Sequence, residues 1–184
     1  MQQYLMVGAG VLAVGFAGFL FTASSRPKEF HLERSILTDA SAADVYAAFS
    51  DFSRFKEWSP WQKLDPNMAT ELSGEQGHVG ASYSWEGNTK VGAGRMTITE
   101  LVPNSHVNIQ LEFLRPFAAT NSCQWRVTEE NGRRRITWSM DGSNDTLFKR
   151  AFAMLANMDK LVGKDFEAGL ASLKLIAEGA PAGP

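Results

Sequence analysis

The sequence predicts an α+β fold in which a curved antiparallel sheet wraps around one long C-terminal helix, with one N-terminal transmembrane helix ahead of it. Three observations lead to this prediction. Residues 4–23 carry no charge, residues 69–142 alternate between apolar and polar side chains, and an apolar stripe at helical spacing runs from Leu147 to Leu173. We therefore expect an anchor at 1–25, one domain at 26–178 and a disordered tail at 179–184.

The N-terminal run YLMVGAGVLAVGFAGFLFTA holds twenty residues. At about 1.5 Å per residue, a helix of this length spans about 30 Å, the thickness of the hydrocarbon core of a bilayer. The alternative is a cleaved signal peptide, which requires a positive n-region and small residues before the cut. No Lys or Arg precedes the run. A cut after Ala23 would place the bulky Phe21 at a position that prefers a small residue, so the sequence favours an uncleaved membrane anchor.

The flanks of this run predict its orientation. Arg26, Lys28 and Arg34 follow it, and positive charge favours the cytoplasmic side, so we expect a single-pass protein of the cytoplasmic membrane with its domain in the cytoplasm. Ala9, Ala13 and Ala17 recur at every fourth residue and form a small-residue face that a transmembrane partner could approach closely. The alternative is that small residues are simply common in such helices.

The domain begins with a strand, because residues 30–37 alternate in polarity. Ser41 then has the character of an N-cap, with Asp44 three residues later, and the following apolar spacing predicts one or two short helices. Trp58, Pro60 and Trp61 end this helical pattern, and the Asp-Pro-Asn at 65–67 is typical of a turn.

Residues 69–142 predict an antiparallel meander with turns at 77–80, 86–88, 103–104, 115–116 and 131–132. Asn131-Gly132 is the strongest hairpin signal in the chain. Alternation assigns one side chain in two to the covered face of the sheet, and its neighbours, such as Thr137 and Ser139, to the wet face. The inward set is Tyr83, Trp85, Met96, Ile98, Val107, Ile109, Leu111, Phe113, Cys123, Trp125, Val127, Ile136, Trp138 and Met140.

A long helix that begins near Asn144 or Asp145 is expected to cover the sheet. Its apolar stripe includes Leu147, Phe166, Leu170 and Leu173, and its expected length is about thirty residues, or 45 Å. Gly163 interrupts it and indicates a bend or a close approach to another element.

Composition excludes several functions. The net charge of −2 gives no basic surface for nucleic acid, so we expect no nucleic-acid partner. The single Cys123 and the scattered His31, His78 and His106 lack metal-ligand spacing, so we expect no metal and no cofactor. No nucleophile motif is present, and no pairing is evident among the acid–base candidates Asp51, Asp65, Glu86 and Glu112, so we name no catalytic residue and lean against an enzyme.

Aromatic and methionine side chains are the more informative group, because they converge between the helices and the sheet. They either fill an ordinary core or line a pocket for an apolar molecule, and sequence alone does not separate the two. The candidate ligand-binding residues are Phe49, Phe52, Trp58, Trp61, Tyr83, Trp85, Met96, Ile98, Phe113, Trp125, Trp138, Met140, Met154 and Met158.

The order of elements and four segments resemble the START-like or SRPBCC superfamily, also called Bet v 1-like or polyketide cyclase/dehydrase and lipid transport proteins. The segments are FHLERSILTDASAADVYAAFSDFSRFKEWSPW (30–61), GHVGASYSWEGN (77–88), VGAGRMTITELVPNSHV (91–107) and MDKLVGKDFEAGLASLK (158–174). The resemblance covers residues 30–177 and implies a helix-grip fold with a hydrophobic cavity for a lipid, isoprenoid quinone or polyketide. It implies no reaction, and no catalytic residue is carried over from it.

Three functions therefore stay open. The first is a membrane-tethered protein that binds a lipid, an isoprenoid quinone or a similar apolar molecule. The second is a non-catalytic accessory subunit of a membrane protein complex, and the third is a cyclase-like enzyme that acts on an apolar substrate.

Overall fold

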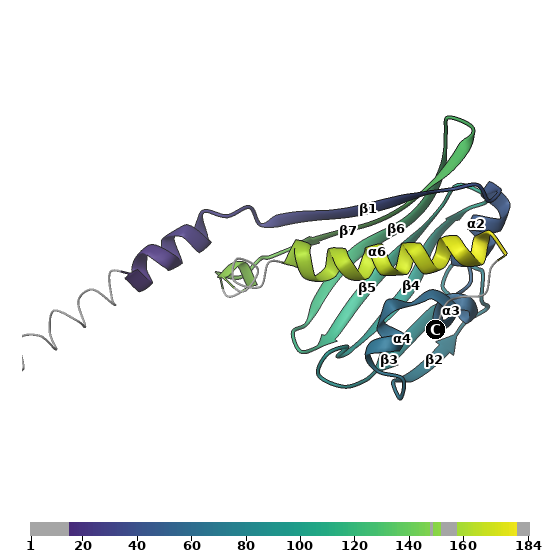
Figure 1. The fold of residues 1–184 in the computed structure, drawn as a ribbon. Helices are drawn as coiled ribbons and strands as arrows, with labels where there is room; N and C mark the ends of the chain where they lie inside the picture. Colours follow the sequence, from purple (N-terminus) through teal and green to yellow (C-terminus); the bar gives the residue numbers. More distant parts are fainter. Residues whose placement is uncertain (1–14, 148, 152–157, 180–184) are drawn as a thin grey trace, which may run out of the picture.

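A seven-stranded antiparallel sheet curves around helix α6 in the computed structural model, which describes residues 15–147, 149–151 and 158–179 (Figure 1). The strand order is β1-β7-β6-β5-β4-β3-β2, so every neighbour except β1 follows along the chain. The strands are β1 (Glu29–Thr38), β2 (Ala69–Ser73), β3 (Ser82–Glu86), β4 (Ala93–Val102), β5 (His106–Arg115), β6 (Ala119–Glu130) and β7 (Arg133–Ser143). The helices are α2 (Ala42–Phe49), the 3₁₀ helix η1 (Phe52–Arg54), α3 (Phe55–Trp58), α4 (Pro60–Leu64) and α6 (Met158–Ala177).

The predicted meander is confirmed, because β2 to β7 pair in sequence order and β1 returns to pair with β7. Asn131 and Gly132 both adopt positive φ, at 51° and 79°, as the two central residues of a tight hairpin require. All members of the predicted inward set are buried except Trp85 and Phe113, which are half-buried. Period-two alternation therefore identified the concave face correctly.

The outer, convex face differs from the prediction at Thr137 and Ser139, which are buried rather than wet. Both lie on β7 between two paired strands. Thr137 stands beside Arg126 in the sheet register and Ser139 beside Glu33, and these two long side chains form an ion pair of 3.7 Å. Short polar side chains on a central strand are thus covered by the longer ones next to them.

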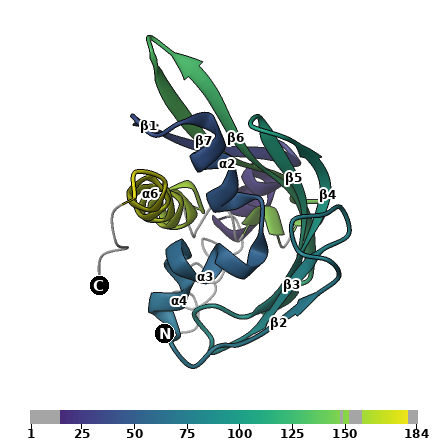
Figure 2. The same ribbon diagram turned by 90° about the vertical axis from the view of Figure 1, so that its right-hand side faces the viewer.

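The segment after β1 holds α2, η1, α3 and α4, and Figure 2 shows these helices on the concave side of the sheet. The predicted cap is confirmed: Ser41 Oγ accepts a hydrogen bond from the Asp44 backbone N–H at 3.1 Å. The prediction that Pro60 and Trp61 end the helical pattern was wrong. Pro60 instead starts α4, because proline lacks the N–H that the first turn leaves unpaired anyway.

Within the described residues, α6 holds twenty residues from Met158 to Ala177, whereas the sequence predicts about thirty from near Asn144 or Asp145. Residues 147 and 149–151 are helical as well, but residues 148 and 152–157 lie outside the described part of the chain. The predicted apolar stripe holds in α6 itself, where Phe166, Leu170 and Leu173 are buried, whereas Leu147 is 37% exposed. The covering helix is therefore the segment after Met158.

At the N-terminus, residues 15–24 are helical. Most of the predicted anchor at residues 4–23, including Ala9 and Ala13, lies outside the described residues, whereas Ala17 lies in this helix and is exposed. Among the described residues, no helix combines the length and the hydropathy that a membrane span requires. Residues 180–184 of the predicted tail also lie outside the described part.

Candidate ligand cavity

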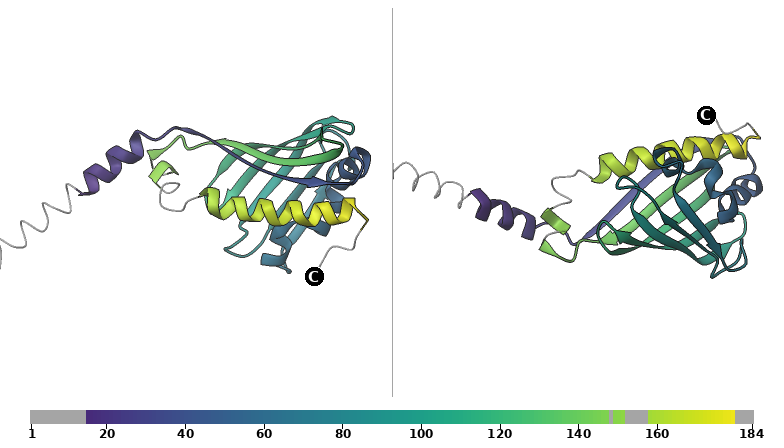
Figure 3. Two further views of the ribbon diagram at one scale, coloured as in Figure 1. Left: turned by 45° about the horizontal axis from the view of Figure 1, so that its top comes forward. Right: turned by 90° about the horizontal axis from the view of Figure 1, so that it is seen from below.

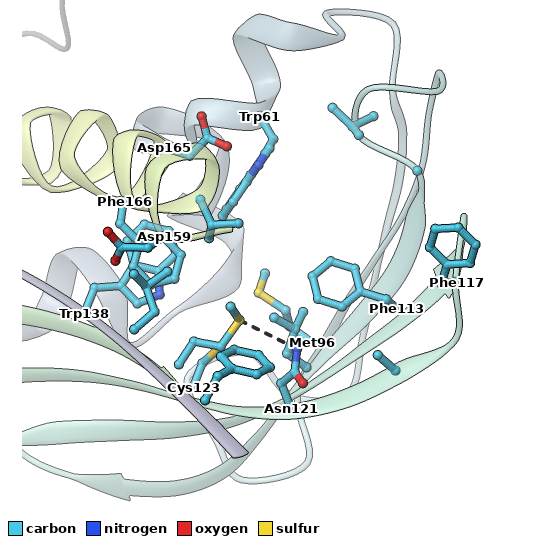
Figure 4. A pocket seen from close by; sticks show the side chains of 18 of the residues that line it. Trp61, Met96, Phe113, Phe117, Asn121, Cys123, Trp138, Asp159, Asp165 and Phe166 are labelled. Carbon is cyan, nitrogen blue, oxygen red and sulfur yellow. Dashed lines mark hydrogen bonds between the residues drawn. The ribbon is translucent and has the colours of Figure 1, made fainter. Parts of the chain in front are cut away.

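A cavity of about 1140 Å³ lies between the concave face of the sheet and α6. Its walls come from β1, β3 to β7, α3, α4 and the first half of α6, so elements distant in the sequence meet around it. Figure 4 shows Trp61 and Phe166 on its helical side and Met96, Phe113 and Asn121 on the sheet. The exposed Arg26, Lys90 and Arg115 also line it and mark the open end.

Aromatic, thioether and aliphatic side chains make up most of the wall. Trp138 stacks on Phe166 with ring centroids 4.0 Å apart and an interplanar angle of 10°, which joins the sheet to α6. Trp61 meets Trp138 edge-to-face at 5.6 Å, and Trp85 meets Phe113 in the same way at 6.0 Å. Such pairs hold large rings in fixed positions and leave an apolar surface.

The structure places the predicted residues in three groups. Eight line the cavity: Trp61, Tyr83, Trp85, Met96, Phe113, Trp125, Trp138 and Met140. Four are buried in the aromatic core away from the cavity wall: Phe49, Phe52, Trp58 and Ile98. Met154 lies outside the described residues, and Met158 is described only as the first residue of α6.

The core group closes the far end of the domain. Phe55 stacks on Trp125 at 5.8 Å, and Trp58 packs edge-to-face against Trp125 at 5.1 Å. The Trp58 Nε1–H donates to the Ala48 carbonyl oxygen at 3.1 Å, which fixes α3 against α2. These contacts fill this end of the domain with aromatic side chains.

Several cavity residues were not among the predicted site residues. Leu111 and Cys123 belonged to the inward set of the sheet, and Phe30 and Leu32 line the cavity from β1. The alternation within β1 could have identified Phe30 and Leu32, because they occupy every second position of that strand. Phe55 and Phe166 line it as well, and no local signal separated them from core aromatics.

Polar side chains line part of the cavity as well. Asn121 is buried, and its Nδ2–H donates to the Met140 sulfur at 3.7 Å. Asp165 lines the cavity beside Trp61, and burial raises the pKa of its carboxyl, while a hydrogen bond from the Trp61 side chain acts in the opposite direction. The Nε1–H groups of Trp125 and Trp138 have no hydrogen-bond partner among the described residues. An apolar molecule with one or two oxygen atoms suits such a surface.

Three of the acid–base candidates, Asp51, Asp65 and Glu86, have structural roles. Asp65 accepts the backbone N–H of Asn88 at 2.7 Å, Asp51 caps η1, and Glu86 pairs with Arg115 at 2.9 Å. Burial raises the pKa of the Cys123 thiol, which keeps it protonated and a poor nucleophile. Among the described residues, no group of three or more His, Cys, Asp or Glu could hold a metal ion.

A family described as "Polyketide cyclase / dehydrase and lipid transport" matches residues 29–178, which is the whole of the sheet and α6. The chain belongs to this family. The resemblance found in the sequence segments is thereby confirmed at the level of the family and the helix-grip fold. No curated protein matches the chain.

Solved structures support the same fold. Protein CV1439 from Chromobacterium violaceum is 15% identical, with a TM-score of 0.57 over 83% of this chain and 99% of that one. The di-domain aromatase/cyclase StfQ of the steffimycin biosynthetic pathway is 11% identical, with a TM-score of 0.60 over 83% of this chain and 51% of StfQ. The Aha1 dimer from Colwellia psychrerythraea is 16% identical, with a TM-score of 0.54 over 79% and 97%. At these identities the likeness concerns the fold alone.

Proposed function

We propose that this protein binds one molecule of a lipid, an isoprenoid quinone or a similar apolar compound in the cavity between the sheet and α6. The cavity itself carries the proposal: about 1140 Å³ of space, walled by Trp61, Trp138, Phe113, Met96 and similar side chains. Apolar walls of this size gain free energy when they exchange water for an apolar ligand. Family membership supports the same assignment.

The size of the cavity favours a large ligand. Pockets for drug-sized molecules occupy about 300–1000 Å³. A volume of about 1140 Å³ exceeds this range, and one open end allows a long chain to extend outward. A quinone ring or lipid carbonyl would lie near Asn121 and the tryptophans, and its tail would follow the aromatic wall towards the opening. We assign no reaction to this cavity.

We further propose that residues 4–23 tether the domain to the cytoplasmic membrane, with the domain on the cytoplasmic side. The uncharged run of twenty residues supports the tether, and Arg26, Lys28 and Arg34 support the orientation. A tether raises the local concentration of the domain at the surface from which an apolar ligand comes.

The experiment is mass spectrometry of organic extracts from the full-length protein purified in mild detergent. We expect one lipid or quinone species in near-stoichiometric amount, absent from a matched chain that contains only the N-terminal segment. An empty domain that co-purifies with stoichiometric membrane proteins would instead support the accessory-subunit function.

A matched pair of variants on β6 tests whether the ligand occupies the cavity. Ala119 lines the cavity near its opening, whereas the adjacent Thr120 is exposed on the convex face. We expect Ala119→Trp to lose most of the bound ligand, because the indole fills the entrance, and Thr120→Trp to retain it. Equal retention by both variants, measured in the same extracts, would place the ligand elsewhere.

A further inference from the structure

The open end of the cavity collects four segments that are far apart in the sequence. In the antiparallel register, Glu29 at the start of β1 faces Ser143 at the end of β7, and Ala93 at the start of β4 faces both Arg115 and Glu86. The β3–β4 turn, the β5–β6 loop, residues 143–147 and the first turns of α6 meet around one opening, because residues of each line the cavity. Figure 3 shows helical residues 15–24 at this same end of the domain.

Positive charge is concentrated around this opening. The cavity lining includes seven Lys or Arg and only three Asp or Glu, whereas the whole chain has a net charge of −2. Arg115 pairs with Glu86, but Arg26, Lys90, Lys149 and Lys164 form no ion pair with the described part of the chain. The seven cations are Arg26, Lys90, Arg115, Lys149, Arg150, Lys160 and Lys164.

Exposed apolar side chains accompany these cations. Leu114 near the end of β5 and Phe117 in the β5–β6 loop flank Arg115 and Pro116 and are 64% and 44% exposed, and Leu147 is 37% exposed. Surfaces that enter the headgroup region of a bilayer combine large apolar side chains with cations. The entrance of this cavity has the same combination.

The chain connects this end of the domain to the N-terminal run. Arg150 Nη1–H donates to the Ser24 carbonyl oxygen at 2.7 Å, which holds the end of helix 15–24 at the opening. Phe16 and Phe21 on that helix are exposed. Helix 15–24 therefore meets the domain beside the cations of the opening.

We propose that this open end, defined by Lys90, Leu114, Arg115, Phe117 and Lys164, docks directly on an anionic phospholipid bilayer, with the cavity entrance facing the lipid. The cations contact phosphate headgroups, and Leu114 and Phe117 enter the interface. The inference rests on the proposed function and adds to it the route of the ligand, which passes between bilayer and cavity without crossing water.

The test uses the full-length protein in vesicles of phosphatidylcholine with phosphatidylglycerol, some of whose acyl chains carry a doxyl quencher. An environment-sensitive fluorophore is attached at Leu114→Cys, or at Glu129→Cys on the opposite end of the sheet. The unsubstituted protein, whose only cysteine is the buried Cys123, measures background labelling. We expect strong quenching at position 114, little at position 129, and a clear decrease at position 114 with phosphatidylcholine alone or high salt.

Charge reversal provides the matched control. Lys90→Glu with Lys164→Glu is expected to abolish the quenching at position 114, whereas Lys56→Glu with Arg133→Glu, two solvent-accessible cations away from the opening, leaves it unchanged. Equal quenching at positions 114 and 129, or quenching that does not depend on anionic lipid, would overturn the docking proposal. A ligand found by mass spectrometry in that case leaves the proposed function standing, so the two failures are distinguishable.

Discussion

Two glycines of α6 set how closely this helix approaches the sheet. A Cβ atom on Gly163 would clash with the guanidinium group of Arg34, and one on Gly169 would lie 2.7 Å from the Trp138 ring. Gly163 was predicted to mark a bend or a close approach, and the close approach is confirmed. Phe166 of α6 stacks on Trp138 of β7 and both line the cavity, so the close contact at Gly169 holds α6 near the inner wall of the cavity.

Gly169→Ala is therefore expected to destabilise the protein although alanine is the better helix former. The propensity gain is about 1 kcal/mol, whereas overpacking a core contact costs about 1–3 kcal/mol. We expect a net loss of about 1 kcal/mol in the free energy of unfolding, measured by urea titration. The exposed Ala171→Gly provides the comparison, since it changes propensity alone. A stabilised Gly169→Ala variant would show that the helix is free to move away from Trp138.

At the scale of elements, α6 is fastened to β1 at both ends. Arg34 of β1 reaches Asp159 Oδ1 at 3.0 Å and Glu167 Oε1 at 2.9 Å. Beyond the last turn, Glu178 accepts a hydrogen bond from Thr38 Oγ1 at 2.7 Å and another from the Asp39 backbone N–H at 3.2 Å. These contacts hold α6 across the concave face of the sheet, so the helix covers the cavity.

The contact between Glu178 and Thr38 makes the attachment of α6 to β1 partly dependent on pH. The Thr38 hydroxyl group lowers the pKa of the Glu178 carboxyl in the folded protein. The contact therefore stabilises the fold above the unfolded-state pKa of about 4.3, and its contribution is lost as the pH falls through the lower folded-state pKa. We expect wild type to exceed Glu178→Gln in free energy of unfolding at neutral pH, with the difference shrinking in acid. Urea titrations at several pH values measure it, and a constant difference would contradict this origin.

At the scale of the whole molecule, the sheet and α6 enclose one cavity. Four of the five tryptophans line the cavity, so ligand entry is expected to change the intrinsic fluorescence. The aromatic core lies at one end of the cavity, and the cations Arg26, Lys90 and Arg115 line the other. A molecule bound in this cavity contacts elements from both ends of the sequence and therefore stabilises the whole fold.

Addition of a short-chain ubiquinone to ligand-depleted protein is expected to raise Tm and quench tryptophan fluorescence. At a free concentration of a hundred times Kd, binding to the folded state alone adds about 2.7 kcal/mol to stability. Ala119→Trp is expected to show neither effect, and Thr120→Trp is expected to show both. A similar rise in Tm for both variants would indicate binding outside the cavity.

The sequence alone identified the order of the elements and the side of the sheet that each strand residue faces. Trp125, Trp138 and Met140 were assigned to the concave face correctly, because side-chain alternation is a local property of an extended chain. The Ser41 cap and the Asn131-Gly132 turn were predicted for the same reason. The burial of Thr137 and Ser139 was not predicted because it depends on long side chains of the neighbouring strands. Pro60 was misassigned because a new helix begins there, which the pattern before it does not show.

Only the tertiary structure decided which inward side chains surround empty space. Phe52 and Trp61 are both aromatic residues of the helical segment, yet Phe52 is enclosed in the core and Trp61 lines the cavity. A cavity is the small difference between the volume that the sheet and α6 enclose and the volume that side chains fill. That difference depends on how closely Gly163 and Gly169 allow α6 to approach the sheet, and no local sequence pattern predicts this distance.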